Sequence, residues 1–364
     1  MKPKILSHFS TMEDPRIERG KIHPLENIIF ISISAIICGA ETWDEIEDFG
    51  IVKSAWLYHI LDMKEGVPSH DTFNRFFQLL DPKEFEKHFR KWVQSIIGKI
   101  DCEYVSIDGK TVRQASKMTD NACIHIVNAW ANLNEVTLGQ IKTDNKSNEI
   151  TAIPQLLETL LLENCIVTID VMGCQKAIAA KIRERKADYI LAVKENQAQL
   201  YNDIMSSFSM LEAKEFSHNI EIDHGRIETR KYSLISNLKY ISGAKDWKDI
   251  KSIVRVESER IIKKTGETSS ETRYYIASID DIEQASKGIR LHWGIENKLH
   301  WTLDVTMNED KSAKREGYAA QNFSLLSKLV LNLLKQDDRK ISIRRKRKIA
   351  GWDTNYLCSI LASV

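Results

Sequence analysis

The stretches YVSID (residues 104–108) and IVTID (residues 166–170) each predict a short apolar strand that ends on an aspartate. Around them the chain alternates between β-rich and helical patterns: strands at CIHIVNAWA (123–131), VTLGQIK (136–142) and YILAV (189–193), and helices over 151–162 and 174–185. Three strands followed by alternating helix and strand predict an α/β core built on a mixed sheet.

The periodicity of the remaining sequence divides it into further units. Before the core, apolar positions recur at helical spacing, and Asp81-Pro82 ends one helix and starts the next. After the core come β-branched and aromatic residues at strand-like spacing, and then a return of helical periodicity. The expected organisation is a helical domain at 1–97, the first part of the core at 98–200, a β-rich insertion at 201–281, a helical completion of the core at 282–335 and a basic tail at 336–364.

The composition is that of a globular protein with a substantial core, with 43% hydrophobic and 28% charged residues in 364. The 52 Lys and Arg nearly balance the 51 Asp and Glu, so any positive surface for a nucleic acid must be local. Such an excess lies between Lys311 and Lys348, where twelve Lys and Arg accompany three acidic residues. It ends in RRKRK (344–348), which predicts a solvated tail or a patch that contacts phosphates.

The cysteines and the apolar stretches predict a cytoplasmic protein. Six scattered cysteines without a CxxC pair are typical of reduced thiols. The N-terminus has no signal-peptide pattern. The most apolar stretch, residues 28–40, is shorter than the roughly 20 residues that cross a bilayer. We therefore expect a buried helix there and no membrane partner.

Asp108 and Asp170 stand at strand ends, where α/β proteins place their sites. Carboxylates from neighbouring strand ends can share divalent cations, which prefer oxygen ligands. Either aspartate alone is better explained as a turn or helix-cap residue. The repetition of the arrangement favours a shared site.

The segment IRLHWGIENKLHWTLDV (289–305) places His292, Glu296 and His300 at successive i, i+4 steps, which predicts one shared helical face. Three interpretations compete. Glu296 completes a carboxylate cluster with the two aspartates, the three side chains bind zinc, or they form a surface stripe. Zinc ranks lowest because the spacing is not HExxH, and spacing alone favours the stripe. The chain also lacks GxxxxGK[ST], GxGxxG and GxSxG, the usual signatures of nucleotide-binding loops and serine hydrolases.

Five segments in the same order resemble the DDE transposases of bacterial insertion sequences, specifically their H-repeat-associated branch. They are IDGKTVR (107–113), NKSNEITAIPQLL (145–157), TIDVMGCQKAIAAKI (168–182), ADYILAVKENQ (187–197) and HWGIENKLHWTLDVTMNED (292–310). The resemblance implies an RNase H-like catalytic core in which Asp108, Asp170 and Glu296 bind Mg²⁺ or Mn²⁺. It also implies a preceding helical domain associated with DNA binding and a β-rich insertion before the glutamate.

The resemblance implies a DNA transposase that cuts and rejoins phosphodiester bonds by two-metal-ion catalysis. Its expected partner is double-stranded DNA, both the terminal inverted repeats of its element and the target. It would act as a homodimer in the bacterial cytoplasm, at the nucleoid. Two alternatives stay open. A transposase without catalysis would bind the same DNA and not cut it, and a metal-dependent nuclease of this fold would cut without joining.

The phosphate contacts are expected to differ from those of the wider group. That group usually has Tyr, Arg and Lys around the glutamate, in a Y-xx-R-xxx-E-xxxxxx-K pattern, where this chain has Ile289, His292 and Leu303. Other cations would then contact the DNA backbone. The candidates are Arg290, His292, Lys298 and His300 beside the glutamate, Lys110, Arg113 and Lys194 beside the strand ends, and Arg344, Arg345, Lys346, Arg347 and Lys348 in the basic run.

Overall fold

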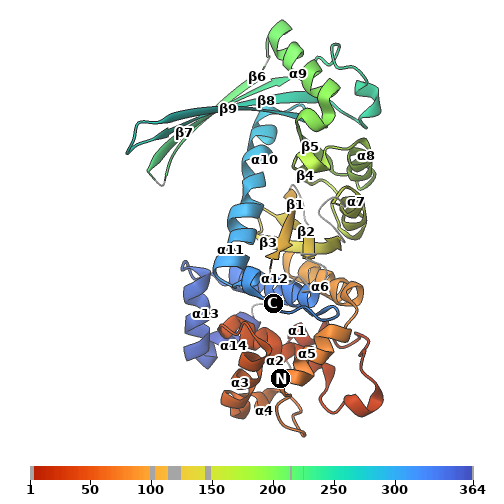
Figure 1. The fold of residues 1–364 in the computed structure, drawn as a ribbon, viewed down its shortest axis with the longest axis vertical. Coiled ribbons are helices and arrows are strands. Elements are labelled where there is room, and N and C mark those ends of the chain that lie inside the picture. The colour runs from red at the N-terminus through yellow and green to blue at the C-terminus, as the bar shows by residue number, and fades with distance from the viewer. Residues whose placement is uncertain are drawn as a thin grey trace.

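The structure is a computed structural model, which describes residues 4–98, 103–113, 124–143, 149–213, 215–223 and 225–362. The molecule is elongated, with a helical lobe at one end, a mixed sheet through the middle and a β-rich arm at the other end (Figure 1). The four described cysteines, Cys38, Cys165, Cys174 and Cys358, are free thiols. Cys102 and Cys123 lie outside the described residues.

The N-terminal residues form the helical lobe that their periodicity predicts. Its helices are α1 (Lys4–Ser7), α2 (Leu25–Cys38), α3 (Trp43–Val52), α4 (Ser54–Ile60), α5 (His70–Leu79) and α6 (Pro82–Ile97). Local signals fix the helix ends. Thr42 and Glu45 form a capping box at the start of α3, and the Asp81 side chain accepts the Lys83 amide at the start of α6. Pro82 occupies the first turn of α6, where its missing N–H costs nothing.

The most apolar stretch of the chain is α2, and residues 27–37 of this helix are all buried. The expectation of a buried helix is confirmed. α2 packs against α3 and against helices from the C-terminal end of the chain. No single helix within the described ranges is long and apolar enough to cross a bilayer, and α2 and α3 meet that test only as a pair bent by 94°.

The C-terminal segment completes the helical lobe. The long helix α12 (Ala319–Gln336) is buried along almost its whole length and contacts α2, α5, α6 and β3. It is followed by α13 (Ile343–Trp352) and α14 (Thr354–Ala362), which both pack on α2 and α12 (Figure 1). The prediction of a basic tail at 336–364 is therefore wrong.

Two cations of the RRKRK run explain why this segment folds back. Lys346 Nζ donates to the carbonyls at the end of α12, those of Leu334 (2.8 Å) and Asp337 (2.6 Å). Arg347 Nε donates to the Ile36 carbonyl near the end of α2 (3.2 Å). The last carbonyls of a helix have no partner within it, and a cation there both satisfies them and complements the helix dipole. Both side chains are consequently buried.

The core sheet has the topology that the alternating pattern predicts. β1 (Tyr104–Val112), β2 (Ile124–Ala131) and β3 (Val136–Thr143) form an antiparallel meander, and β4 (Ile166–Ile169) and β5 (Asp188–Val193) then run parallel to β1. The strand order is β3-β2-β1-β4-β5. α7 (Glu149–Thr159) leads into β4, and α8 (Lys176–Glu184) connects β4 to β5. The RNase H-like mixed-sheet core is confirmed.

Helices cover both faces of the core sheet. α7 and α8 lie on one side, and α10 (Ile282–Gly294) runs along the other (Figure 1). A Cβ on Gly288 would stand 2.7 Å from Ile190 Cδ1 and 3.2 Å from Tyr104 Cδ1, so this glycine lets α10 lie directly against the strands. α10 continues through a π-helical turn, η7 (Ile295–His300), into α11 (Trp301–Val305).

The insertion extends the core sheet. After α9 (Ala198–Met210) come β6 (Glu215–Asp223), β7 (Arg226–Ile235), β8 (Ser252–Ile262) and β9 (Thr268–Ala277). β9 pairs antiparallel with β5, which gives one nine-stranded sheet in the order β3-β2-β1-β4-β5-β9-β8-β7-β6. The arm and the core therefore share a continuous hydrogen-bonded ladder.

Candidate active site

Asp108 and Asp170 lie side by side because their strands are in register. β1 and β4 are parallel, and Ile107 pairs with Ile169. The residue that follows each isoleucine is one of the two aspartates. Asp108 is inside β1, which continues four residues beyond the predicted strand end to Val112. Asp170 follows β4 and also caps a short 3-10 turn, accepting the Met172 amide at 3.1 Å. The cap role and the shared position coexist.

Glu296 approaches the aspartates from the π-helical turn η7. Glu296 is exposed. Its charge nevertheless helps to raise the pKa of Asp108, and the charge of Asp170 helps to raise the pKa of Glu296. Within the described residues, no three His, Cys, Asp or Glu side chains converge closely enough to enclose a metal ion. Glu296 is thus near the two aspartates, but the three carboxyl groups do not converge on one point.

The electrostatics of the three carboxyl groups are unfavourable in the protein alone. Burial, and then the charges of Asp170 and Glu296, raise the pKa of Asp108 to about 8. Burial is also the main cause that raises the pKa of Asp170 and of Glu296. Desolvated carboxylates that repel one another form an all-oxygen donor set, which fits a hard divalent cation. These residues therefore fit the metal ions that the resemblance implies.

His292 and His300 point toward the sheet. His292 Nδ1 lies 2.9 Å from Thr168 Oγ1, and His300 Nδ1 lies 3.5 Å from Asp108 Oδ2. Burial lowers the pKa of His292 to about 4 and that of His300 to about 3, so both are neutral at physiological pH. The surface-stripe interpretation is wrong for these two residues, because His292 Nδ1 and both ring nitrogens of His300 face side chains of the sheet. Neither side chain offers these nitrogens to a DNA phosphate in this structure. They contact different strands and share no zinc ion.

The π-helical turn explains how both histidines face the sheet. Side chains eight residues apart on an α-helix are offset by about 80°, since each residue advances 100°. A wider turn between Ile295 and His300 reduces that offset. His292 and His300 therefore share a face, as the spacing predicts, whereas Glu296 is exposed. π-helical turns inside helices are frequent at functional sites.

Lys110 does not reach DNA phosphates. Its Nζ lies 2.7 Å from Asp304 Oδ1, 2.9 Å from Glu309 Oε2 and 3.4 Å from Asp310 Oδ1, and its side chain is only 7% exposed. The sequence placed it beside a strand end, but β1 continues past it and brings it against α11 and the turn that follows α11. The predicted DNA contact is therefore wrong.

The other predicted DNA-contacting cations are paired with carboxylates, buried at helix ends, or exposed. Arg290 donates two hydrogen bonds to Glu221 (2.6 and 2.7 Å), and Lys298 is paired with Glu135. Lys346 and Arg347 are buried at helix ends, so their predicted contacts are wrong. Besides Lys298, the exposed candidates are Arg113, Lys194, Arg344, Arg345 and Lys348.

The sequence reasoning missed a buried pair behind Asp108. His125 Nε2 is hydrogen-bonded to Glu149 Oε1, and His125 Nδ1 lies 3.0 Å from Thr111 Oγ1. A Cβ on Gly109 would stand 2.2 Å from Glu149 Oε1, so the glycine after Asp108 makes room for this pair. Two features of the sequence could have indicated this pair: the glycine that follows Asp108 and the acidic residue in the NEI segment at 148–150. Asn128 was also missed, because its position opposite Asp108 depends on the register of β1 and β2.

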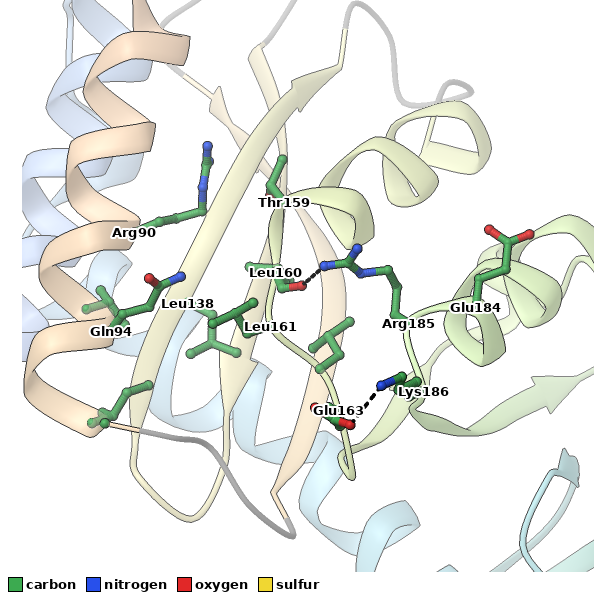
Figure 2. A pocket seen from close by; sticks show the side chains of 14 residues that line it. Arg90, Gln94, Leu138, Thr159, Leu160, Leu161, Glu163, Glu184, Arg185 and Lys186 are labelled. Carbon is green, nitrogen blue, oxygen red and sulfur yellow. Dashed lines mark hydrogen bonds and ion pairs between the residues drawn. The ribbon is translucent and has the colours of Figure 1, made fainter.

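A hollow elsewhere on the core carries no comparable chemistry. It lies between α6, β3 and the loops after α7 and α8 (Figure 2). Figure 2 shows the Arg185 side chain donating to the Leu160 carbonyl (2.8 Å) and Lys186 paired with Glu163 (3.1 Å). Glu163 precedes β4, so the hollow is at the amino ends of the parallel strands, opposite the edge that carries the aspartates.

Two protein families match most of the chain. Residues 6–93 match the family described as "DDE_Tnp_1-associated", and residues 103–333 match "Transposase DDE domain". "Putative transposase YncI" of Escherichia coli O157:H7 is 43% identical over 99% of this chain and 94% of its own. "H repeat-associated putative transposase YhhI" of Escherichia coli (strain K12) is 38% identical over 99% of this chain and 98% of its own. A piggyBac transposase synaptic complex with hairpin DNA gives a TM-score of 0.45 at 11% identity, covering 98% of this chain and 76% of that one.

Proposed function

The chain belongs to the DDE transposases, and from that premise we propose that Asp108, Asp170 and Glu296 hold the divalent metal ions with which it cuts and rejoins DNA. The observation that carries the proposal is the register of β1 and β4, which sets two half-buried aspartates side by side directly after the last paired residues, Ile107 and Ile169. Glu296 is electrostatically coupled to both. Such a group of carboxylates is costly in a protein that never binds a cation.

The enzymes of this family generally use divalent metal ions, and we propose Mg²⁺ or Mn²⁺ for this chain. Both are hard cations that prefer oxygen ligands, and the three proposed ligands supply only oxygen. When bound, a pair of such ions activates the attacking water or 3′-hydroxyl and stabilises the leaving oxygen. The protein's own contribution is to hold the carboxylates on its core elements: Asp108 within β1, Asp170 directly after β4, and Glu296 on the π-helical turn that follows α10.

The proposed DNA partners are the terminal inverted repeats of the element and a target duplex. Lys194 is exposed at the end of β5, and its charge acts on Asp170, so it is placed to contact a phosphate near the carboxylates. Arg113 at the end of β1 is exposed as well. We propose that the helical lobe contributes the remaining DNA contacts, that two copies act together on two DNA ends, and that the protein works at the bacterial nucleoid.

Cleavage assays with the intact chain test this function. The substrates are labelled duplexes taken from the DNA that flanks the gene for this chain, incubated with Mg²⁺, Mn²⁺ or EDTA. Asp108→Asn, Asp170→Asn and Glu296→Gln should each lose at least about 10³-fold in cleavage rate while still binding DNA, because each removes a metal ligand. Asp280→Asn, an exposed change in the loop before α10, should cleave normally.

The same assay separates the alternatives. Addition of a supercoiled plasmid to a pre-cut end should yield joined product with the wild-type chain. Cutting without joining would identify a nuclease. Binding without cutting under either metal would identify a transposase that has lost catalysis. Full activity in any of the three carboxylate variants would remove that residue from the proposed site.

A further inference from the structure

Three side chains meet on the face of the sheet that carries Asp108. Asp108 in β1 pairs directly with Asn128 in β2, and directly paired residues of antiparallel strands project to the same face. His300, at the end of the π-helical turn, lies over this pair. Its Nε2 is 3.3 Å from Asn128 Nδ2, and its Nδ1 is 3.5 Å from Asp108 Oδ2. The imidazole thus bridges an amide on one strand and a carboxylate on the next.

The orientation of the Asn128 amide is fixed by the backbone. Asn128 Nδ2 donates to the Ile126 carbonyl at 3.2 Å. A flipped amide would set its oxygen against that carbonyl oxygen, which offers no hydrogen. The NH₂ group is therefore the one that also faces His300.

The amide in turn fixes the state of the His300 ring. An NH₂ group has only donors, so the His300 Nε2 that faces it must be an acceptor and carry no proton. A neutral imidazole has one N–H, which is then on Nδ1, the nitrogen that faces Asp108. In this tautomer the N–H of an uncharged ring points toward Asp108 Oδ2, 3.5 Å away.

We propose that His300 is a positioning residue for Asp108: its Nδ1–H donates to Asp108 Oδ2, and Asn128 selects the tautomer that does so. This inference rests on the proposed function, in which Asp108 is a metal ligand. A carboxylate has about four lone-pair sites, so one hydrogen bond fixes its rotation and leaves sites for a cation. Partners that orient metal ligands in this way are commonly worth 10–100-fold in metal affinity or activity.

The position of His300 excludes a role as a phosphate contact in this conformation. Its side chain is only 12% exposed, and both ring nitrogens face the sheet. His292, on the same helical face, has a different role. Its side chain is hydrogen-bonded to Thr168 on β4. His292 ties the helix to β4, whereas His300 reaches a carboxylate.

Two substitutions separate the hydrogen bond from the mere presence of a polar side chain. The amide nitrogen of asparagine can occupy the place of Nδ1, whereas the amide of glutamine reaches the place of Nε2. His300→Asn keeps a donor toward Asp108, and His300→Gln keeps only the contact with Asn128. We expect His300→Gln to lose 10–100-fold in cleavage rate and in Mn²⁺ affinity, measured by electron paramagnetic resonance on the DNA-free protein. His300→Asn should retain most of both.

A direct measurement on the wild-type chain keeps the proposal testable if the variants do not fold. ¹⁵N shifts of the labelled imidazoles distinguish the two neutral tautomers, and His300 should carry its proton on Nδ1. Asn128→Ala should shift that proton toward Nε2. A wild-type Nε2–H tautomer, or equal losses in His300→Asn and His300→Gln, would overturn the assignment. If Asp108→Asn is inactive but His300→Gln is fully active, positioning fails and the triad stands; if Asp108→Asn is active, the triad itself fails.

Discussion

Asp108 and Lys110 are two residues apart on β1 and project to the same face, yet their surroundings are opposite. Lys110 is held by Asp304 and Glu309. Asp108 stands among other acids. We call Lys110, Asp304 and Glu309 the balanced cluster, because its opposite charges are paired. We call Asp108, Asp170 and Glu296 the unbalanced cluster, because all three are acids.

The balanced cluster is a structural device. Burial alone would lower the pKa of Lys110, but the carboxylates of Glu309 and Asp304 raise it above its usual range. Burial would raise the pKa of Glu309, but Lys328 and Lys110 lower it to about 2. Lys328 also donates to Gln140 Oε1 (2.7 Å), which ties α12 to β3. The opposite charges of these lysines and carboxylates therefore neutralise one another within the protein.

The unbalanced cluster is suited to a ligand. Among the residues that the structure describes, the strongest influences on Asp108 are burial and the charges of Asp170 and Glu296, and these disfavour its ionised form. The contrast supports the proposed function: charge around Lys110 is neutralised within the protein, whereas charge around Asp108 would be neutralised by the proposed bound cation.

The largest expected effect comes from breaking the balanced cluster. Lys110→Met keeps a similar side-chain length but leaves Glu309, which is 3% exposed, without one of its two lysines. We expect a loss of about 3–5 kcal/mol in the free energy of unfolding, because an uncompensated buried charge remains. Urea denaturation followed by circular dichroism measures it.

Two controls sharpen this prediction. Arg113→Met removes a side chain that is 80% exposed and should cost less than about 1 kcal/mol, as for surface ion pairs in general. Adding Glu309→Gln to Lys110→Met should restore part of the lost stability, since the stranded charge is then gone. Equal stability of wild type and Lys110→Met would contradict the structural role.

Relieving the unbalanced cluster should have a smaller effect of the opposite sign. The pKa of Asp108 is raised from 3.8 to about 8, so protonation stabilises the metal-free fold. That contribution is complete below pH 3.8 and is lost as the pH rises toward 8. Asp108→Asn in EDTA should therefore gain on the order of 1 kcal/mol over wild type at pH 8 and nothing near pH 4. Thermal unfolding at the two pH values measures the difference.

Metal addition is the matching control. At 100 times its dissociation constant, Mn²⁺ should stabilise the wild-type fold by about 2.7 kcal/mol and Asp108→Asn by much less. The order of stability at pH 8 should then invert between EDTA and Mn²⁺. A wild-type chain whose stability is independent of pH between 4 and 8, with no response to Mn²⁺, would place the unbalanced cluster among ordinary surface acids.

The smallest expected effect concerns the RRKRK run, which contains both kinds of charge. Lys346 and Arg347 are satisfied by carbonyls, whereas Arg344, Arg345 and Lys348 are exposed. Replacement of these three by Gln should reduce the salt-dependence slope of DNA binding by up to about 3, similarly for all sequences. Fluorescence anisotropy across a salt series measures the slope. Gln at Lys245, Lys248 and Lys251 is the matched control, and an equal effect there would indicate net charge alone.

The sequence predicts the elements of this fold better than their assembly. The strand patterns around Asp108 and Asp170 predict the core and one edge of it, and the resemblance adds Glu296. Spacing could not predict that Lys110 meets Asp304, because that contact joins residues almost 200 positions apart. Arg347 looked like part of a solvated run because its partner, the Ile36 carbonyl, is defined only when α13 packs on α2. Long-range packing decides each of these cases.

The register of the sheet also lay beyond local patterns. The insertion is β-rich in sequence, but its attachment through four pairs between β5 and β9 is a choice among strand edges that alternation does not specify. The same limit hid Asn128, whose role depends on lying opposite Asp108.

The ladder between β5 and β9 has a mechanical consequence. A hinge between the arm and the core would have to break the four pairs from Ile190–Ala277 to Val193–Tyr274, and α10 braces the joint by touching β1, β4, β5, β6 and β7. The arm is therefore attached rigidly to the core and not through a hinge. A displacement of its far end would be transmitted along one sheet to β5, the strand that pairs with β4 before Asp170.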